Sequence, residues 1–303
     1  LNVLLGLAGQ ISLGHVGFYA IGAYVSAILA TKLGWSFWLA FPAAGVAAGI
    51  AGTLLAIPAL RVTGPYLAMV TIAFAFVVEQ GAAEWRDLTG GWNGILGIPT
   101  PAAFGHVFHE REIALFVIAL TVVATGLFAR LRNSPWGLAM RAVRDSEVAA
   151  QSIGVNPVAT RTVAFALAAV IAGLAGSTFA AMTNFISPES FPFFQSILFL
   201  LVVIIGGAGT LLGPVVGAVV VVLLPEMLSG LAEYRLLFVG VLLLAVLRLA
   251  PEGVVGAIAR RFAKPDPATP RAGGDIARFL AERRSDHSLA VEELTISFGG
   301  VKA

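Results

Sequence analysis

The apolar run ATRTVAFALAAVIAGLAGSTFAAMT (159–183) contains a single charged residue, Arg161. A helix of about 20 mainly apolar residues crosses the roughly 30 Å hydrocarbon core of a bilayer. The run therefore predicts a transmembrane helix. The whole chain has the same character, because 58% of its residues are hydrophobic and only 12% are charged.

The same criterion predicts further crossings on both sides of this run. The fold class that we predict is all-α: a polytopic transmembrane bundle of about eight helices. The predicted spans are 12–31, 36–58, 65–83, 112–131, 159–183, 194–208, 213–229 and 235–250.

Glycines interrupt the apolar stretch after Phe193, at Gly206, Gly207, Gly209 and Gly213. Two interpretations stay open for this stretch, a re-entrant hairpin and a tight turn between two ordinary helices. Such breaks are tolerated where neighbouring helices or a cavity satisfy the exposed backbone. Gly206, Gly207 and Gly209 are therefore candidates for the lining of a translocation path.

Lysines and arginines near the ends of the spans predict the orientation. With 130–161 in the cytoplasm, alternation places ten basic residues on the cytoplasmic side and four on the other side, and it leaves the C-terminus in the cytoplasm. The ten are Arg61, Arg130, Arg132, Arg141, Arg144, Arg161, Arg248, Arg260, Arg261 and Lys264; the four are Lys32, Arg86, Arg111 and Arg235.

The composition changes at residue 263, where KPDPATPRAGGD begins. This Pro- and Gly-rich run predicts a linker over 263–287 after a membrane domain over 1–262. Residues 289–300 (LAVEELTISFGG) alternate apolar and polar positions as a strand does. Because the chain also begins inside an apolar stretch at Leu1, we expect it to be part of a longer protein.

The segment NSPWGLAMRAVRDSEVAAQSIGVNP (133–157) is polar yet rich in helix formers. Met140, Val143, Val148 and Ile153 lie among charged residues, so a short helix here suits docking of one face on a partner. The alternative is a solvated connecting helix without a partner.

This segment resembles the cytoplasmic coupling loop of ABC importer permeases, whose pattern is Glu-Ala-Ala, three residues, then Gly. Ala149, Ala150 and Gly154 match the pattern, whereas Val148 stands at the glutamate position and Glu147 precedes it. The resemblance implies an ATPase-coupling role for seven residues: Arg141, Arg144, Asp145, Glu147, Ala149, Ala150 and Gly154.

Three other stretches are similar to branched-chain amino acid permease subunits of ABC importers: 1–24, 185–218 and 233–256. This resemblance implies a permease in the cytoplasmic (inner) membrane, acting with a homologous permease subunit, ABC ATPase domains and an extracytoplasmic substrate-binding protein. Permeases for urea or short-chain amides share these motifs and remain an alternative. A more distant alternative, an ion-coupled secondary transporter, is disfavoured because the spans contain almost no carboxylates.

The final residues SLAVEELTISFGGVKA (288–303) resemble the first strand of an ABC ATPase domain, cut off after its start. The resemblance implies a fused parent and an adenine-stacking role for Phe298. No Walker A loop is present in these residues. ATP and magnesium would therefore be held elsewhere, and we expect neither a cofactor site nor an enzyme here.

Gln10, Ser12 and His15 form a polar cluster between Gly9 and Gly14. An interrupted helix of this kind suits binding of a zwitterion along a translocation path. The alternative is that the small residues simply allow close helix packing.

Several other functions are disfavoured by the sequence. Glu79 and Glu226 lie near span ends, where snorkelling to the interface is the simpler interpretation. Four histidines without cysteines or clustered carboxylates predict no metal site, and the net charge of +2 gives no argument for a nucleic-acid partner.

Overall fold

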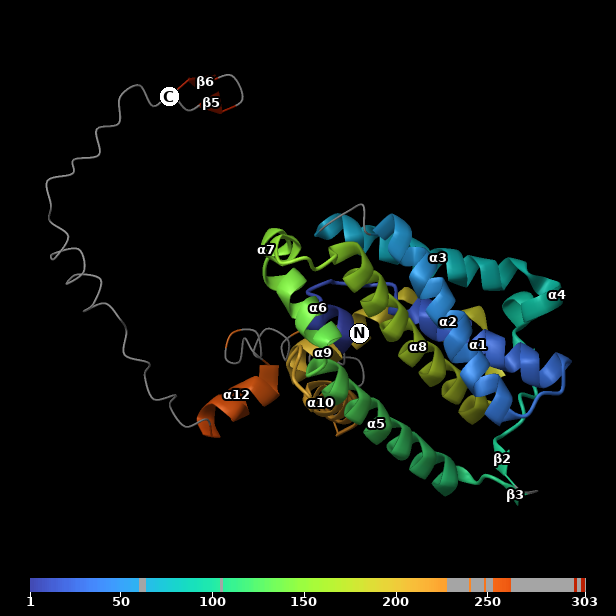
Figure 1. Cartoon of the computed structure of the whole chain (residues 1–303). Helices are drawn as coiled ribbons and strands as arrows, with labels where there is room; N and C mark the ends of the chain where they lie inside the picture. The colour runs from blue at the N-terminus through green and yellow to red at the C-terminus, as the bar shows by residue number, and fades with distance from the viewer. Residues whose placement is uncertain are drawn as a thin grey trace, which may run out of the picture. The chain divides into compact units, whose positions relative to one another are not determined.

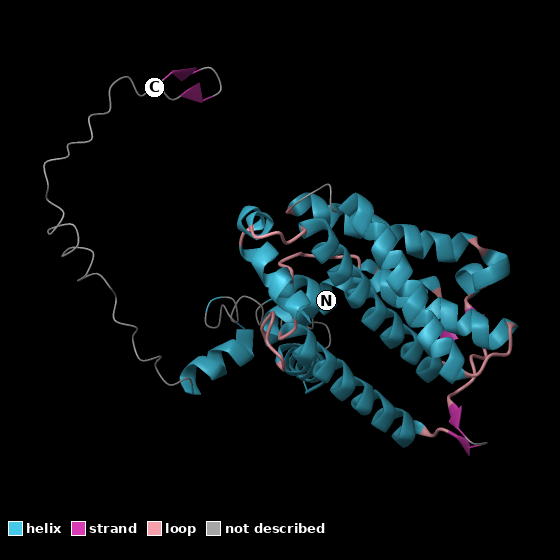
Figure 2. Cartoon of the chain, in the orientation of Figure 1, coloured by secondary structure: helices cyan, strands magenta, loops and turns pink. Residues whose placement is uncertain are grey.

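The described part of the chain is almost entirely helical (Figures 1 and 2). The computed structural model describes residues 1–59, 64–103, 106–227, 240, 248, 253–262, 297–298 and 301–302. Its helices are η1 (Val3–Leu7, a π-helix), α1 (His15–Lys32), α2 (Phe37–Ala59), α3 (Pro65–Glu84), α4 (Arg86–Thr89), η2 (Gly91–Asn93), α5 (Glu110–Arg132), α6 (Pro135–Asp145), α7 (Glu147–Ser152), α8 (Pro157–Thr183), η3 (Pro188–Ser190), α9 (Phe193–Gly206), α10 (Gly213–Met227) and α12 (Gly253–Phe262).

Five stretches among the described residues are long and apolar enough to cross a membrane: Phe37–Ala59, Tyr66–Glu84, Glu110–Arg132, Pro157–Thr183 and Pro188–Gly206. They coincide with the second to sixth predicted spans. The helix α1 occupies most of the first predicted span but is not among the five, since it carries polar residues such as His15 and Lys32 at its ends. The helix α10 occupies most of the seventh span, and the eighth (235–250) lies almost wholly outside the described residues.

The helices α1, α2 and α8 pack against one another along their length (Figure 1). Glycine permits this close approach. A Cβ added at Gly22 of α1 would lie 2.1 Å from the carbonyl oxygen of Gly173 in α8, and one at Gly176 would lie 1.9 Å from the carbonyl oxygen of Tyr19. Small residues let helix backbones touch directly, which is how membrane helices commonly associate.

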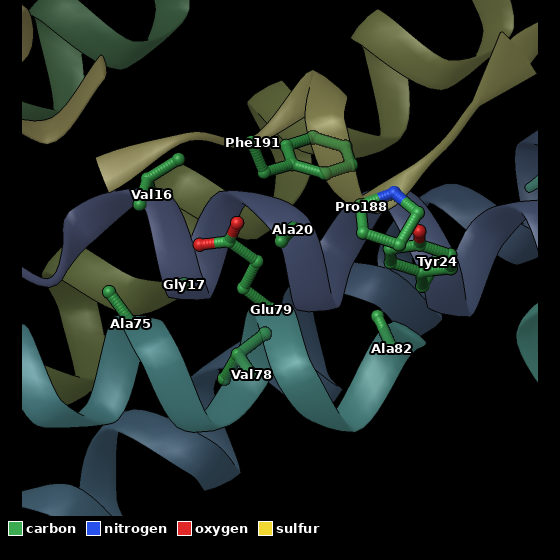
Figure 3. A pocket seen from close by; sticks show the side chains of 10 residues that line it. All are labelled: Val16, Gly17, Ala20, Tyr24, Ala75, Val78, Glu79, Ala82, Pro188 and Phe191. Atoms are coloured by element: carbon green, nitrogen blue, oxygen red, sulfur yellow. The ribbon is translucent and has the colours of Figure 1, made fainter. Parts of the chain in front are cut away.

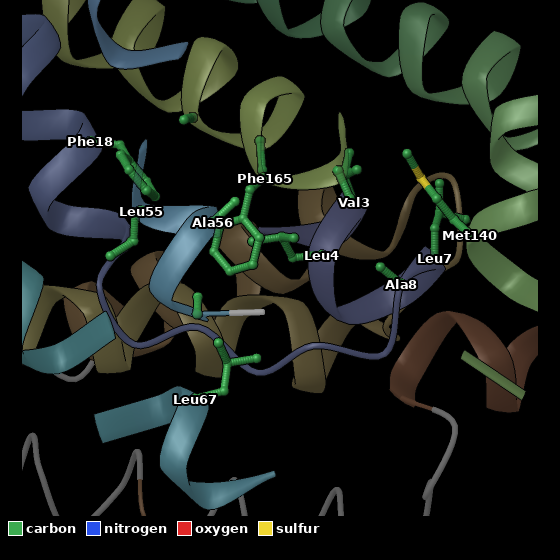
Figure 4. Close-up of a cluster of buried hydrophobic side chains, with 14 of the residues drawn as sticks. Val3, Leu4, Leu7, Ala8, Phe18, Leu55, Ala56, Leu67, Met140 and Phe165 are labelled. Atoms are coloured by element: carbon green, nitrogen blue, oxygen red, sulfur yellow. The ribbon is translucent and has the colours of Figure 1, made fainter. Parts of the chain in front are cut away.

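The N-terminal π-helix η1 packs into this same core. Leu4 lies beside Phe165 there, and Met140 of α6 lies beside Leu7; all four side chains are buried (Figure 4). Residues of η1, α1, α2, α6 and α8 thus share one apolar cluster. The polar segment 133–157 is therefore held against the membrane helices through its own apolar side chains.

The helix α8 runs from one end of this helical unit to the other. Its 27 residues correspond to about 40 Å at about 1.5 Å per residue. The helix α7 precedes its first residue, and at its other end the strand β4 (Phe185–Ile186) pairs antiparallel with β1 (Ile95–Leu96), Ile95 facing Ile186. A hairpin of β2 (Ala102–Ala103) and β3 (His106–Val107) precedes α5.

The chain divides into two units, Leu1–Arg260 and Arg261–Ala303. In the second unit beyond Phe262, the structure describes β5 (Ser297–Phe298) and β6 (Val301–Lys302), which pair antiparallel. The linker predicted over 263–287 lies outside the described residues.

We predict that Gly176→Ala lowers the stability of the folded protein, because the new methyl group has no room beside the backbone of α1. Overpacking of this kind typically costs about 1–3 kcal/mol. Gly126→Ala in α5 is the matched control, since no neighbouring atom lies within 4 Å of an added Cβ there. Thermal unfolding in detergent micelles should show a lower midpoint for Gly176→Ala alone; equal midpoints would contradict the packing argument.

Candidate translocation path and coupling loop

The helix that begins at η1 is interrupted before α1. Residues 8–14 are not helical, and Gly9 adopts a positive φ of 65° that glycine tolerates without steric cost. The α1 helix then begins at His15. The predicted polar interruption in this stretch is therefore a real break in the helix.

Side chains from two other helices satisfy backbone groups at the break. The N–H of Leu13 donates to Oγ1 of Thr71 in α3 at 3.0 Å, and the N–H of Val16 donates to Oγ of Ser196 in α9 at 3.0 Å. Sequence reasoning did not single out Thr71 or Ser196. Each is a hydroxyl residue inside an apolar span, and such residues are too common in membrane helices to predict a role at the break.

The three polar residues predicted here are buried. Ser12, His15 and Gln10 are 0%, 3% and 8% exposed, and Nδ1 of His15 lies 3.0 Å from Oγ of Ser12. Among the described residues, Nε2 of His15 and Oε1 of Gln10 have no hydrogen-bond partner. Buried polar atoms without partners are costly, so these two atoms are suited to meeting a polar ligand.

The glycine-rich stretch forms the turn between α9 and α10, and part of it meets η1. Asn2 accepts a hydrogen bond from the N–H of Gly209 at 2.8 Å and donates to the carbonyl oxygen of Thr210 at 3.0 Å. A Cβ at Gly6 would lie 2.3 Å from the backbone nitrogen of Gly209. The structure thus brings Gly209 beside the N-terminal segment.

The other two glycines predicted for the path pack elsewhere. A Cβ at Gly206 would lie 1.7 Å from the carbonyl oxygen of Gly213, and one at Gly253 would lie 2.3 Å from the Cα atom of Gly207. These contacts hold α9, α10 and α12 together. Packing is therefore sufficient to explain glycine at position 206, and the positive φ of 113° favours glycine at position 207.

A cleft of about 150 Å³ joins the helix break to the polar segment. Gln10 lies in its wall together with Arg144 of α6 and Arg161 of α8. The remaining lining residues are Ala8, Gly9, Ile11, Gly64, Leu67 and Val143.

The polar segment folds as two short helices. Ser134 and Ser146 cap α6 and α7, their hydroxyl oxygens accepting from the N–H groups of Gly137 and Ala149 at 3.2 and 3.3 Å. After α7, Gly154 has a φ of 85°, and its N–H donates to the carbonyl oxygen of Gln151 at 2.9 Å. Gly154 therefore ends the helix as predicted, in a left-handed turn that glycine favours.

The apolar residues of this segment face two ways. Met140, Val143 and Ala150 are buried against the chain itself. Val148 and Ile153 are 79% and 74% exposed. The expectation that all four apolar residues form one docking face needs correcting, because Met140 packs in the same apolar cluster as η1 and Val143 is also buried.

Arginines tie the segment to the membrane helices. Nη1 of Arg144 donates to the carbonyl oxygen of Gly6 at 2.7 Å, and Nε of the same residue pairs with Asp145 at 2.9 Å. Glu147 of α7 pairs with Arg161 of α8 at 2.7 Å. In the same segment, Arg141 donates to the carbonyl oxygen of Arg132 at 3.0 Å. Displacement of α6 would therefore act directly on η1.

Glu79 lies between α3 and α1. It lines a narrow crevice, which has no room for a water molecule, together with Val16, Ala20 and Tyr24 of α1 (Figure 3). The side chain of Glu79 faces α1. Contact with this neighbouring helix is therefore a second explanation for Glu79, in addition to the predicted snorkelling to the membrane interface. The side chain of Glu226 lies outside the described part of the structure.

Together, the apolar helices, the buried polar break and the docked polar segment define a mostly helical membrane protein. The chain belongs to the family described as branched-chain amino acid transport system / permease component, which matches residues 1–247. This membership confirms the family that the sequence predicted, and the family is one of transport permeases rather than enzymes.

Two similar relatives are the high-affinity branched-chain amino acid transport system permease proteins LivM of Salmonella typhimurium and Escherichia coli. Each is 38% identical over 279 residues, covering 84% of this chain. The chain spans 66% of each LivM sequence, just under two thirds of its length. The LivH permease protein of Escherichia coli is 23% identical over 275 residues, which is 84% of this chain and 88% of LivH. No solved structure matches the chain significantly.

We predict that Thr71→Val destabilises the helix break, because it leaves the half-buried N–H of Leu13 without its acceptor. Such a loss costs about 1–3 kcal/mol. Thr121→Val in α5 is the matched control, since Thr121 is exposed and bonds only within its own helix. Hydrogen exchange of residues 8–16 should accelerate in Thr71→Val and not in Thr121→Val; unchanged exchange in both would refute the role of Thr71.

Proposed function

We propose that the chain is the permease component of an ATP-driven ABC importer that carries branched-chain amino acids across the cytoplasmic (inner) membrane. The observation that carries this proposal is the α6–α7 segment, which is anchored on the membrane helices by Arg144 and exposes several apolar side chains, among them Val148 and Ile153. Exposed apolar side chains that gather on one polar segment favour a surface that a partner covers. The family membership of residues 1–247 supports the same function.

The partners that we propose are a homologous permease subunit, ABC ATPase domains and an extracytoplasmic substrate-binding protein. The support for a homologous subunit is that this chain aligns with both LivM and LivH, two permease proteins named for the same transport system. The substrate path would lie between the two subunits.

We propose that α6 and α7 lie in the cytoplasm, with the C-terminus on the same side. The support is the concentration of arginines in and around this segment, because positively charged residues favour the cytoplasmic side. The ends of α8 then place the paired strands β1 and β4 on the extracytoplasmic face. The full membrane domain would comprise residues 1–262 and about eight crossings.

The C-terminal residues fit a fused architecture. We propose that 263–287 is a linker and that 288–303 begins an ABC ATPase domain, in which Phe298 would stack on adenine. The support is the sequence resemblance of SLAVEELTISFGGVKA to the opening strand of such domains.

The proposed path includes Gln10, Ser12 and His15 at the helix break, with Gly209 beside it. A zwitterionic amino acid needs both hydrogen-bond donors and acceptors, and an interrupted helix supplies them from backbone and side chains. Gly206 and Gly207 would shape the path indirectly, through the α9–α10 turn.

The mechanism follows from the contacts of Arg144, Asp145, Glu147 and Arg161. Closure of the ATPases would move α6 and α7 as docked helices. Arg144 would pass this displacement to Gly6 at the end of η1, and the Glu147–Arg161 pair would pass it to α8. A helix break can change its geometry with fewer lost hydrogen bonds than a continuous helix, so the break would switch between outward and inward access.

We predict that Val148→Asp and Ile153→Asp each reduce ATP-dependent amino acid uptake by the reconstituted transporter at least tenfold, because the ATPase would no longer dock on α7. Both residues are exposed, so membrane insertion and the thermal midpoint should stay as in the unmodified protein. Leu96→Asp is the matched control, because Leu96 is also 74% exposed but lies in β1, at the other end of α8. Undiminished ATP-dependent uptake by both test variants would remove the basis of the coupling-loop assignment.

Bulky replacements of Ala150 or Gly154 should also abolish transport while leaving insertion intact. They are less specific tests, because Ala150 is buried and Gly154 has a left-handed conformation. Either change would disturb α7 itself as well as its docking.

The substrate is tested by ATP-dependent uptake in proteoliposomes that contain the full-length protein, its permease partner, the ATPases and the binding protein. We expect uptake of labelled leucine and not of labelled urea. Urea uptake would keep the architecture and change the substrate, whereas uptake independent of ATP would overturn the proposal.

A further inference from the structure

Three potential metal ligands converge where the β2–β3 hairpin meets α5. His106 lies in β3, His109 immediately precedes α5, and Glu112 lies in its first turn. Their nitrogen and oxygen ligand atoms all lie within 4.8 Å of one another. The sequence analysis predicted no metal site. The sequence signal for this cluster is the spacing His-x-x-His-x-x-Glu over residues 106–112.

The distances between the ligand atoms suit coordination of one ion by all three residues. Nε2 of His106 lies 2.9 Å from Oε1 and 3.1 Å from Oε2 of Glu112, and Nδ1 of His109 lies 3.7 Å from Oε2. Zinc ligands lie about 2.0–2.2 Å from the ion, so tetrahedral ligand atoms are about 3.4 Å apart. Small side-chain rotations would bring all three residues to that spacing.

Neighbouring contacts hold the ligands in place. Trp38 of α2 donates from Nε1 to the carbonyl oxygen of Ala102 at 2.8 Å, and its ring lies 6.0 Å from that of Phe108. Oε2 of Glu112 accepts from the N–H of His109 at 2.8 Å. The hairpin is thus fixed on α2 while the carboxylate is fixed on α5.

We propose that His106, His109 and Glu112 bind one divalent cation of the zinc class (Zn²⁺, Ni²⁺, Co²⁺ or Cu²⁺). Two imidazoles and one carboxylate match the preference of these ions, whereas Mg²⁺ and Ca²⁺ prefer oxygen ligands. The side chains are 58%, 80% and 41% exposed, so water can complete the coordination. The ion would link the β2–β3 hairpin to α5. Only the assignment of this metal site to the extracytoplasmic face rests on the proposed function.

The test uses the intact protein in detergent, without a polyhistidine tag, titrated with Zn²⁺ by calorimetry. We expect one equivalent to bind, with affinity at least tenfold lower in His106→Ala and in His109→Ala, and no binding at this site in the double variant. Glu110→Gln is the matched control, since Glu110 lies in the same turn outside the cluster. Equal Zn²⁺ binding by the unmodified protein and the double variant would overturn the proposal.

Two further readouts separate this site from nonspecific surface binding. Cu²⁺ electron paramagnetic resonance should show coupling to two nitrogens, and to fewer in each single variant. A large excess of Mg²⁺ should not displace Zn²⁺ from this site, because Mg²⁺ prefers oxygen ligands. Neither readout depends on amino acid uptake, so failure here is distinguishable from failure of the transport proposal.

Discussion

The architecture depends on how the backbone of residues 8–14 is satisfied. A helix that is interrupted in apolar surroundings exposes N–H and C=O groups, and each one without a partner costs several kcal/mol. Thr71 and Ser196 supply acceptors from α3 and α9, while Asn2 ties η1 to the turn after α9. These few hydrogen bonds explain why helices far apart in the sequence gather around the N-terminal segment.

Glycine provides the complementary constraint. The close approach of α1, α2 and α8 leaves no space for a Cβ at Gly22, Gly173 or Gly176. This tight core keeps α1 in place, so that its first residue, His15, remains buried beside Ser12. The polar break and the close-packed core therefore stabilise each other.

The α6–α7 segment connects the break to the aqueous phase. Its buried face belongs to the same apolar cluster as η1, and Arg144 reaches the carbonyl oxygen of Gly6. Its exposed residues Val148 and Ile153 face away from that cluster. In the function that we propose, this segment would bind the ATPase on one side and act on the helix break on the other.

Much of this could be predicted from the sequence, because apolar run length and glycine spacing are local properties. They determined the second to sixth spans, the break near Gln10 and the end of α7 at Gly154. Partners distant in the chain could not be predicted. The acceptors at Thr71 and Ser196, the inward face of Met140 and the convergence of His106 with Glu112 arise from packing between elements. The sequence by itself therefore determined a helical membrane permease, whereas only the tertiary structure decided which polar groups meet, since those contacts depend on helix positions in space.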